Sequence, residues 1–77
     1  MWILVNVSQD VDGGVYAGQP SVFETEEEAV ANAKENIADD YGITKEEVEN
    51  EALEGGTPYV LSMSRDGRFE VYTVFWV

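Results

Sequence analysis

Residues 59–77 read YVLSMSRDGRFEVYTVFWV. Two segments rich in β-branched and aromatic residues, 59–64 and 69–77, flank Asp66-Gly67, a dipeptide that suits the positive φ angles of a two-residue type I′ turn. This pattern predicts a β-hairpin. Its register pairs Leu61 with Tyr72, Tyr59 with Val74, Ser62 with Val71, and Val60 with Thr73.

The predicted hairpin carries apolar side chains on both faces. One face holds Tyr59, Leu61, Tyr72, Val74 and Trp76, and the other holds Phe69, Val71, Phe75 and Val77. Helices on one side of a sheet cover only one face, so the other would be an apolar patch of the kind that marks a dimer or partner interface. We expect Tyr59, Tyr72 and Trp76 to form this interface, in a homodimer or with another protein. The alternative is that these rings lie half-buried at the sheet rim with their polar tips in water.

The segments before this hairpin predict a second one. Residues 2–8 alternate as a strand, and Asp12-Gly13-Gly14 supplies a turn. A weaker strand over residues 15–23 is interrupted around Gly18-Gln19-Pro20, since proline cannot donate a ladder hydrogen bond and therefore favours an edge or a bulge.

Two helices are predicted between the hairpins. Thr25 and Glu28 fit a capping box at the start of the first helix, and Gly42 is a C-terminal cap. Thr44 and Glu47 repeat the box, and the second helix should stop at Gly55-Gly56. This second helix would turn three apolar side chains inward, those of Val48, Ala52 and Leu53.

The order ββααββ predicts the α+β class: one four-stranded antiparallel sheet, in the order 2-1-4-3, with two helices packed on one face. The length of 77 residues fits a single domain, 1–77, and 44% hydrophobic residues is enough to form a core. Without cysteine there is no disulfide framework and no thiolate metal site. The N-terminal segment has no basic region before its apolar residues and no long apolar run follows, so we expect a cytoplasmic protein without a membrane segment.

The net charge of -12 is concentrated in the middle of the chain. Residues 24–54 hold 12 acids and 2 bases, a balance of -10, whereas the remainder holds 4 acids and 2 bases, a balance of -2. On the first helix Glu28, Asn32, Glu35 and Asp39 fall at helical spacing, and on the second Glu47, Glu51 and Glu54 do the same. Carboxylates one helical turn apart are spaced by about 6 Å, similar to neighbouring phosphates on a nucleic-acid strand. The sequence therefore predicts two negative stripes that attract basic partners and repel nucleic acid.

These stripes define the candidate partner-binding residues: Glu28, Glu35, Asp39, Asp40, Glu46, Glu47, Glu49, Glu51 and Glu54. The expected partner is a basic, nucleic-acid-binding protein, whose Lys- and Arg-lined channel the carboxylates would occupy. The alternative is that the acids only keep a small protein soluble, or that the source lives in high salt.

Enzymatic chemistry has little support in the composition. There is no His or Cys, hence no ready general base near neutral pH and no thiol nucleophile. An enzyme would need a carboxylate whose pKa burial raises well above its usual range. Asp10-Val11-Asp12-Gly13 begins like a calcium loop, but the later ligands are missing, so a turn is favoured. We expect no catalytic residues, no cofactor and no metal.

In size, acidity and lack of catalytic residues, the chain resembles small phage-encoded inhibitors of bacterial defence, the anti-restriction and anti-CRISPR proteins, several of which are acidic DNA mimics. The resemblance implies inhibition by occlusion of a nucleic-acid channel, with the aromatic face adding dimerisation or anchoring. The rival hypothesis is a structural or interaction module that binds through its aromatic sheet face, with acidic helices that only solubilise it.

Overall fold

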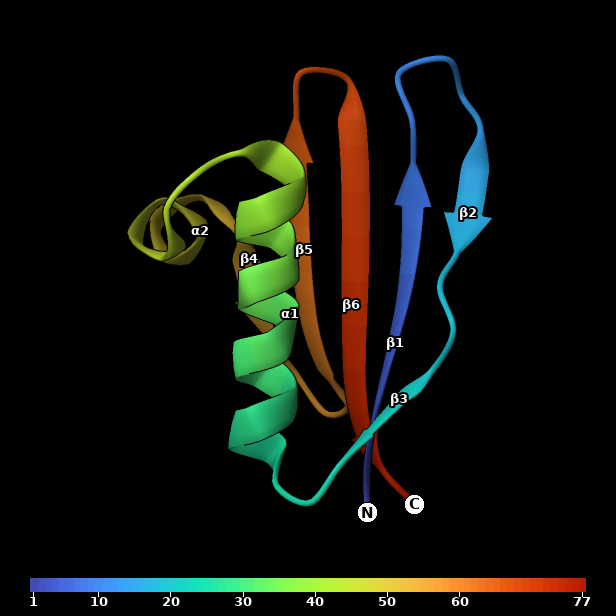
Figure 1. The fold of residues 1–77 in the computed structure, drawn as a ribbon, viewed down its shortest axis with the longest axis vertical. Helices are drawn as coiled ribbons and strands as arrows, with labels where there is room; N and C mark the ends of the chain where they lie inside the picture. Colours follow the sequence, from blue (N-terminus) through green and yellow to red (C-terminus); the bar gives the residue numbers. More distant parts are fainter.

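A computed structural model describes all of residues 1–77. Its elements are β1 (Trp2–Gln9), β2 (Val15–Ala17), β3 (Ser21–Phe23), α1 (Glu26–Tyr41), α2 (Lys45–Glu51), β4 (Leu53–Gly55), β5 (Tyr59–Arg65) and β6 (Arg68–Trp76). Six antiparallel strands form one sheet in the order β2-β1-β6-β5-β4, with β3 also paired to β1. α1 lies across one side of this sheet, and α2 lies beside α1 at the margin formed by β4 (Figure 1).

The α+β class is confirmed, but the prediction of four strands is wrong. The interrupted strand 15–23 forms two separate strands, and β4 lies where the second helix was expected to continue. The segment 15–23 splits into β2 and β3. Gly18 donates its N–H to the carbonyl of Asn6, and a Cβ at Gly18 would lie 2.0 Å from the Asn6 Oδ1 atom. This close approach, together with Pro20, interrupts the pairing of the segment 15–23 with β1, and the interruption separates β2 from β3.

The second departure is at the end of α2, which stops at Glu51 instead of continuing to the glycines. Ala52 is extended, with φ -74° and ψ 145°, and leads directly into β4, which pairs with β5. The prediction that Leu53 turns inward is therefore wrong: its side chain is 75% exposed on β4.

The β5–β6 hairpin matches the predicted register at all four pairs. Asp66 and Gly67 both have positive φ, 53° and 79°, as a type I′ turn requires. The core lies between this hairpin, β1 and the helices. Its buried residues are Leu4, Ala29, Ala33, Ile37, Ala38, Val48, Leu61, Met63, Tyr72 and Val74.

Candidate functional site

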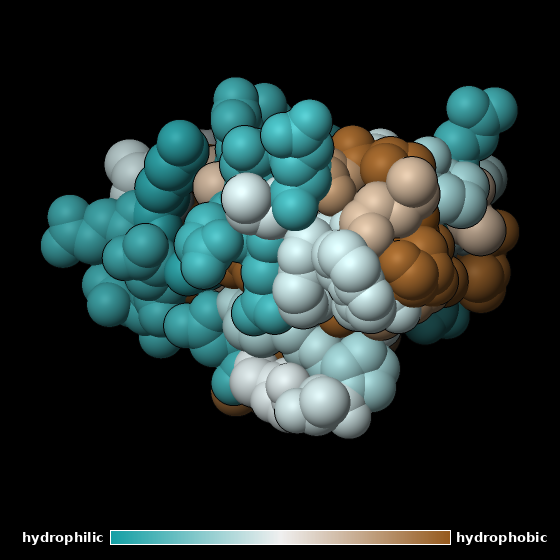
Figure 2. Space-filling view, turned by 90° about the horizontal axis from the view of Figure 1, so that it is seen from below, coloured by the Kyte–Doolittle hydropathy of each residue, from teal (hydrophilic) through white to brown (hydrophobic).

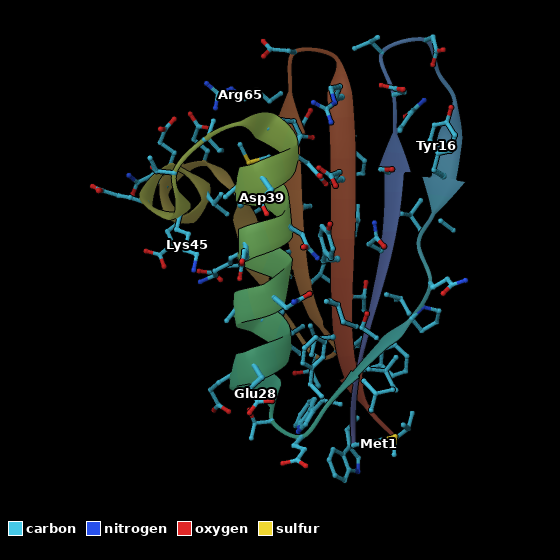
Figure 3. All side chains as sticks on the ribbon, viewed as in Figure 1. Met1, Tyr16, Glu28, Asp39, Lys45 and Arg65 are labelled. Atoms are coloured by element: carbon cyan, nitrogen blue, oxygen red, sulfur yellow. The ribbon has the colours of Figure 1, made fainter.

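The acidic side chains of α1 remain a free row on the surface. Glu28, Glu35 and Asp39 are exposed, and no Lys or Arg lies within ion-pair distance of their carboxylates. Figure 3 shows Glu28 and Asp39 on the side of α1 that faces away from the sheet. These three residues, the α1 row, form one coherent negative stripe.

The acids around α2 are mostly paired with bases from other elements. Lys34 Nζ lies 3.9 Å from a Glu49 oxygen and 3.5 Å from a Glu54 oxygen. Arg65 of β5 lies 3.8 Å from Glu47 and 3.4 Å from Glu51. Of the predicted partner-binding acids between residues 46 and 54, only Glu46 has no ion pair with a basic side chain.

The second predicted stripe is also broken geometrically. Glu54 lies on β4 and not on the second helix. Glu47 is held in a complete capping box, since the Thr44 Oγ1 accepts from the Glu47 N–H and the Glu47 carboxylate accepts from the Thr44 N–H. The prediction of two equivalent helical stripes is therefore wrong for the second one.

The predicted aromatic interface is not one surface. Tyr72 is only 4% exposed and belongs to the core beneath the helices, so its assignment to an interface is wrong. Tyr59 is half-buried on the same side of the sheet, where its hydroxyl donates to the Glu54 carboxylate. Burial, then this hydrogen bond, raises the pKa of Tyr59, and the same bond lowers the pKa of Glu54. Of the three aromatic residues predicted at the interface, only Trp76 has most of its surface exposed to solvent, at 63%.

The apolar surface that the helices leave uncovered is the opposite face of the sheet, which we call the open face. Strand alternation and the observed register assign fifteen side chains to it. They are Ile3, Val5, Val7, Gln9, Val15, Ala17, Val22, Leu53, Val60, Ser62, Ser64, Phe69, Val71, Thr73 and Phe75. None is charged.

A carboxyl pair that was not expected from the sequence lies under the C-terminal end of α1. Glu70 is 4% exposed and faces the helix layer, where the Tyr72 hydroxyl donates to its Oε1 at 3.4 Å. Its Oε2 is buried without a hydrogen-bond partner. Burial, and then the neighbouring Asp40 carboxyl, raises the pKa of Glu70 to about 7.

The raised pKa meets one requirement for acid–base chemistry, but access is lacking. A small cavity of about 190 Å³ lies beside this pair and is lined by Ser8, Gln9, Asp10, Tyr16, Asp40, Arg68, Phe69 and Glu70. The unpartnered Glu70 oxygen has almost no accessible surface, so a substrate in this cavity would not reach it. Asp40, predicted as a partner-binding residue, instead neighbours this buried carboxyl, and its backbone carbonyl accepts from Arg68 at 3.1 Å.

The largest cavity, about 580 Å³, lies at the end of the sheet where the two termini meet. Its walls include Trp2, Tyr59 and Trp76, and Glu26 at the start of α1 contributes a carboxylate. Sequence reasoning grouped Tyr59 with Trp76 but missed Trp2 and Glu26. The predicted order 2-1-4-3 makes β1 and β6 neighbours, but it does not give the register that places Trp2 opposite Trp76.

The Asp10–Gly13 segment forms a turn closed by its own hydrogen bonds. The Asp12 carboxylate accepts from the Gly14 N–H at 3.1 Å, and the Asp10 carboxylate accepts from the Val11 N–H at 3.2 Å. No group of three or more metal-ligating side chains is found in the structure.

No family model, curated protein sequence or solved structure matches this chain. None of its helices combines the length and the apolar character needed to cross a membrane.

Proposed function

We propose that this chain is a non-enzymatic protein-binding module that pairs with a second copy of itself through the open face. In the pair, the two helix layers face outward. The observation that carries the proposal is that a six-stranded sheet exposes one whole face without a charged side chain, in a chain of net charge -12.

The exposure of the open face supports a stable contact. Val7, Val15, Val22, Leu53 and Phe69 are between 42% and 75% exposed. With the partly buried residues between them, these side chains form one uncharged, largely apolar surface across the sheet, of the kind that marks protein interfaces.

The second copy is favoured as the occupant by charge and by the sheet edges. Packed sheets lie about 10 Å apart, so helix layers on the two outer sides would be separated by about 30 Å, several Debye lengths at physiological salt. The repulsion between two acidic chains is then largely screened. Pairing along the edges is disfavoured because the edge strands β2, β3 and β4 have only three residues each.

The test is the mass in solution of variants that place a charge on the open face. Thr73 lies at the middle of this face, between Val5 and Val60. The parent protein should sediment with twice the monomer mass, and the Thr73→Lys variant should sediment as a monomer. Gln19→Lys, an equal charge change at an exposed loop residue, should remain dimeric. Added salt should tighten the parent dimer. A parent chain that is monomeric at high concentration and high salt would overturn the proposal.

A second candidate, nucleic-acid mimicry, is supported by the unpaired α1 row alone. Its carboxylates would bind a basic channel of a DNA- or RNA-binding protein, in an interaction that salt weakens. The triple variant of Glu28→Gln, Glu35→Gln and Asp39→Asn should lose this partner. A control with the same change in charge, Asp10→Asn, Glu24→Gln and Asp66→Asn, should retain it. Duplex DNA should compete with the chain for this partner. Binding that neither DNA nor salt disrupts would contradict mimicry.

A further inference from the structure

Three aromatic residues on the helix side of the sheet line the cavity at the end of the sheet. Trp2 of β1 and Trp76 of β6 face each other across the ladder, with ring centroids 5.4 Å apart and planes at 66°. Tyr59 stands on the same side of the sheet, on β5. The remaining lining comes from Gly56, Thr57, Pro58, Val74 and Phe75. Figure 2 looks at this end of the molecule and shows pale residues of intermediate hydropathy between the hydrophilic helix side and the hydrophobic sheet side.

The only charged residue in the lining is Glu26, the first residue of α1. None of the four basic side chains lines this cavity. Lys34 and Arg65 form ion pairs with the acids around α2, and Arg68 lies over the Tyr41 ring. The fourth, Lys45, lies in α2 and does not line the cavity. The lining therefore holds one carboxylate and no basic side chain. The Met1 ammonium, also at this end of the sheet, donates to the Val77 carbonyl at 3.0 Å. Glu26, Glu27 and Glu28 outweigh the positive end of the α1 dipole.

We propose that this cavity binds a methylated ammonium group, either on a lysine side chain or on a small quaternary amine. The face of an aromatic ring is negative, and rings arranged around a cation attract it most strongly when they also remove it from water. Two tryptophans, a tyrosine and one carboxylate are the components of such a cage. The volume of about 580 Å³ lies within the range of ligand sites, so a trimethylammonium head and the start of its chain fit inside.

The adjacent surface favours a cation over a neutral ligand. A neighbouring cavity of about 440 Å³ shares Glu26 and Tyr59 with the aromatic one, and in it the Lys34 ammonium lies among Glu27, Glu49 and Glu54. The chain thus already holds one ammonium on the far side of Tyr59. It also holds one cation on an aromatic face, with the Arg68 guanidinium carbon 4.7 Å from the Tyr41 ring centroid.

The experiment uses the fluorescence of the two tryptophans, which are the only ones in the chain and both line the cavity. Choline and 3,3-dimethylbutanol have the same shape and differ in charge. Choline should shift the emission saturably, and the neutral alcohol should bind at least tenfold more weakly. Peptides with trimethyllysine or unmodified lysine form the second arm. If the trimethyllysine peptide binds more tightly than choline, the natural ligand is a methylated lysine of a protein. If choline binds more tightly, the natural ligand is a small quaternary amine.

Variants separate a cage from a merely apolar cavity. Trp76→Leu changes an exposed ring and should weaken choline binding at least tenfold, measured by chemical-shift changes so that the lost fluorophore does not matter. Glu26→Gln should weaken it several-fold, whereas Glu28→Gln, two residues further along α1 and outside the cavity, should leave it unchanged. Tyr59→Phe keeps the ring and should keep the affinity. No saturable response to choline or to the trimethyllysine peptide, equal binding of the neutral alcohol, or unchanged binding in folded Trp76→Leu would overturn the proposal.

Discussion

Leu53 and Leu61 lie on neighbouring strands, but their side chains point to opposite faces of the sheet. Leu61 is 1% exposed in the core and Leu53 is 75% exposed on the open face. Leu61→Ala should therefore lower the free energy of unfolding by about 2–5 kcal/mol, and Leu53→Ala by less than about 0.5 kcal/mol. Urea unfolding of dilute protein, followed by circular dichroism, measures both. Similar losses at the two positions would contradict the face assignment.

The C-terminal cap of α1 gives a second prediction. Gly42 has φ 66° and ψ 36°, and a Cβ built on it would meet no atom within 4 Å. Gly42→Ala should thus cost only the conformational penalty of the left-handed region, about 1 kcal/mol, without a steric clash. Gly42→Asn should cost less, because asparagine tolerates this conformation better. Thermal or urea unfolding of the two variants checks the order, and a costlier Asn variant would contradict it.

Arg65 connects β5 to α2 through Glu47 and Glu51. Arg65→Gln should lower stability by roughly 0.5–1 kcal/mol at low salt, because partly exposed ion pairs are individually weak. Lys45→Gln makes the same charge change at a residue without an ion pair and should alter stability less. The difference between these variants should shrink as salt is added. A difference that stays constant from low to high salt would mean that Arg65 acts through packing.

The buried Glu70 carboxyl should make stability depend on pH. Its ordinary pKa is 4.5, and in the folded chain it is raised to about 7. Between these values the folded state holds a proton that the unfolded chain releases. The free energy of unfolding therefore falls as pH rises through this window, by at most about 1.4 kcal/mol per unit.

Glu70→Gln removes this titration, so the variant should gain stability relative to the parent as the pH rises from about 5 to about 7.5. Urea midpoints measured across this range test the prediction. Glu28→Gln serves as a control, because that carboxylate is exposed and has no charged partner. A stability difference for Glu70→Gln that does not change with pH would show that the buried carboxyl is already ionised throughout.

The parts of the fold that the sequence predicted are those fixed by short-range chemistry. The Asp66-Gly67 turn sets the β5–β6 register, and Thr25, Thr44 and Gly42 mark helix ends through contacts within a few residues. The three-residue strand β4 escaped prediction because so short a segment becomes a strand only when a partner strand is already beside it.

The candidate site was less predictable for a related reason. Alternation correctly separated the two faces of the final hairpin, with Tyr72 on one and Val71 on the other. Both faces are apolar, so the pattern does not indicate which one the helices cover. The acids around α2 were grouped correctly by charge, yet their ion pairs depend on Lys34 and Arg65, which reach them only in the folded chain.

The two central strands of the sheet come from opposite ends of the chain. Eight residue pairs join β1 to β6, and the Met1 ammonium donates to the Val77 carbonyl at 3.0 Å. Each hairpin can form early from nearby residues, but joining them closes a loop of almost the whole chain, which is slow. During synthesis on a ribosome, the sheet must therefore remain as unfinished pieces until β6 has emerged. A truncation within β6 would then disrupt the middle of the sheet rather than fray its margin.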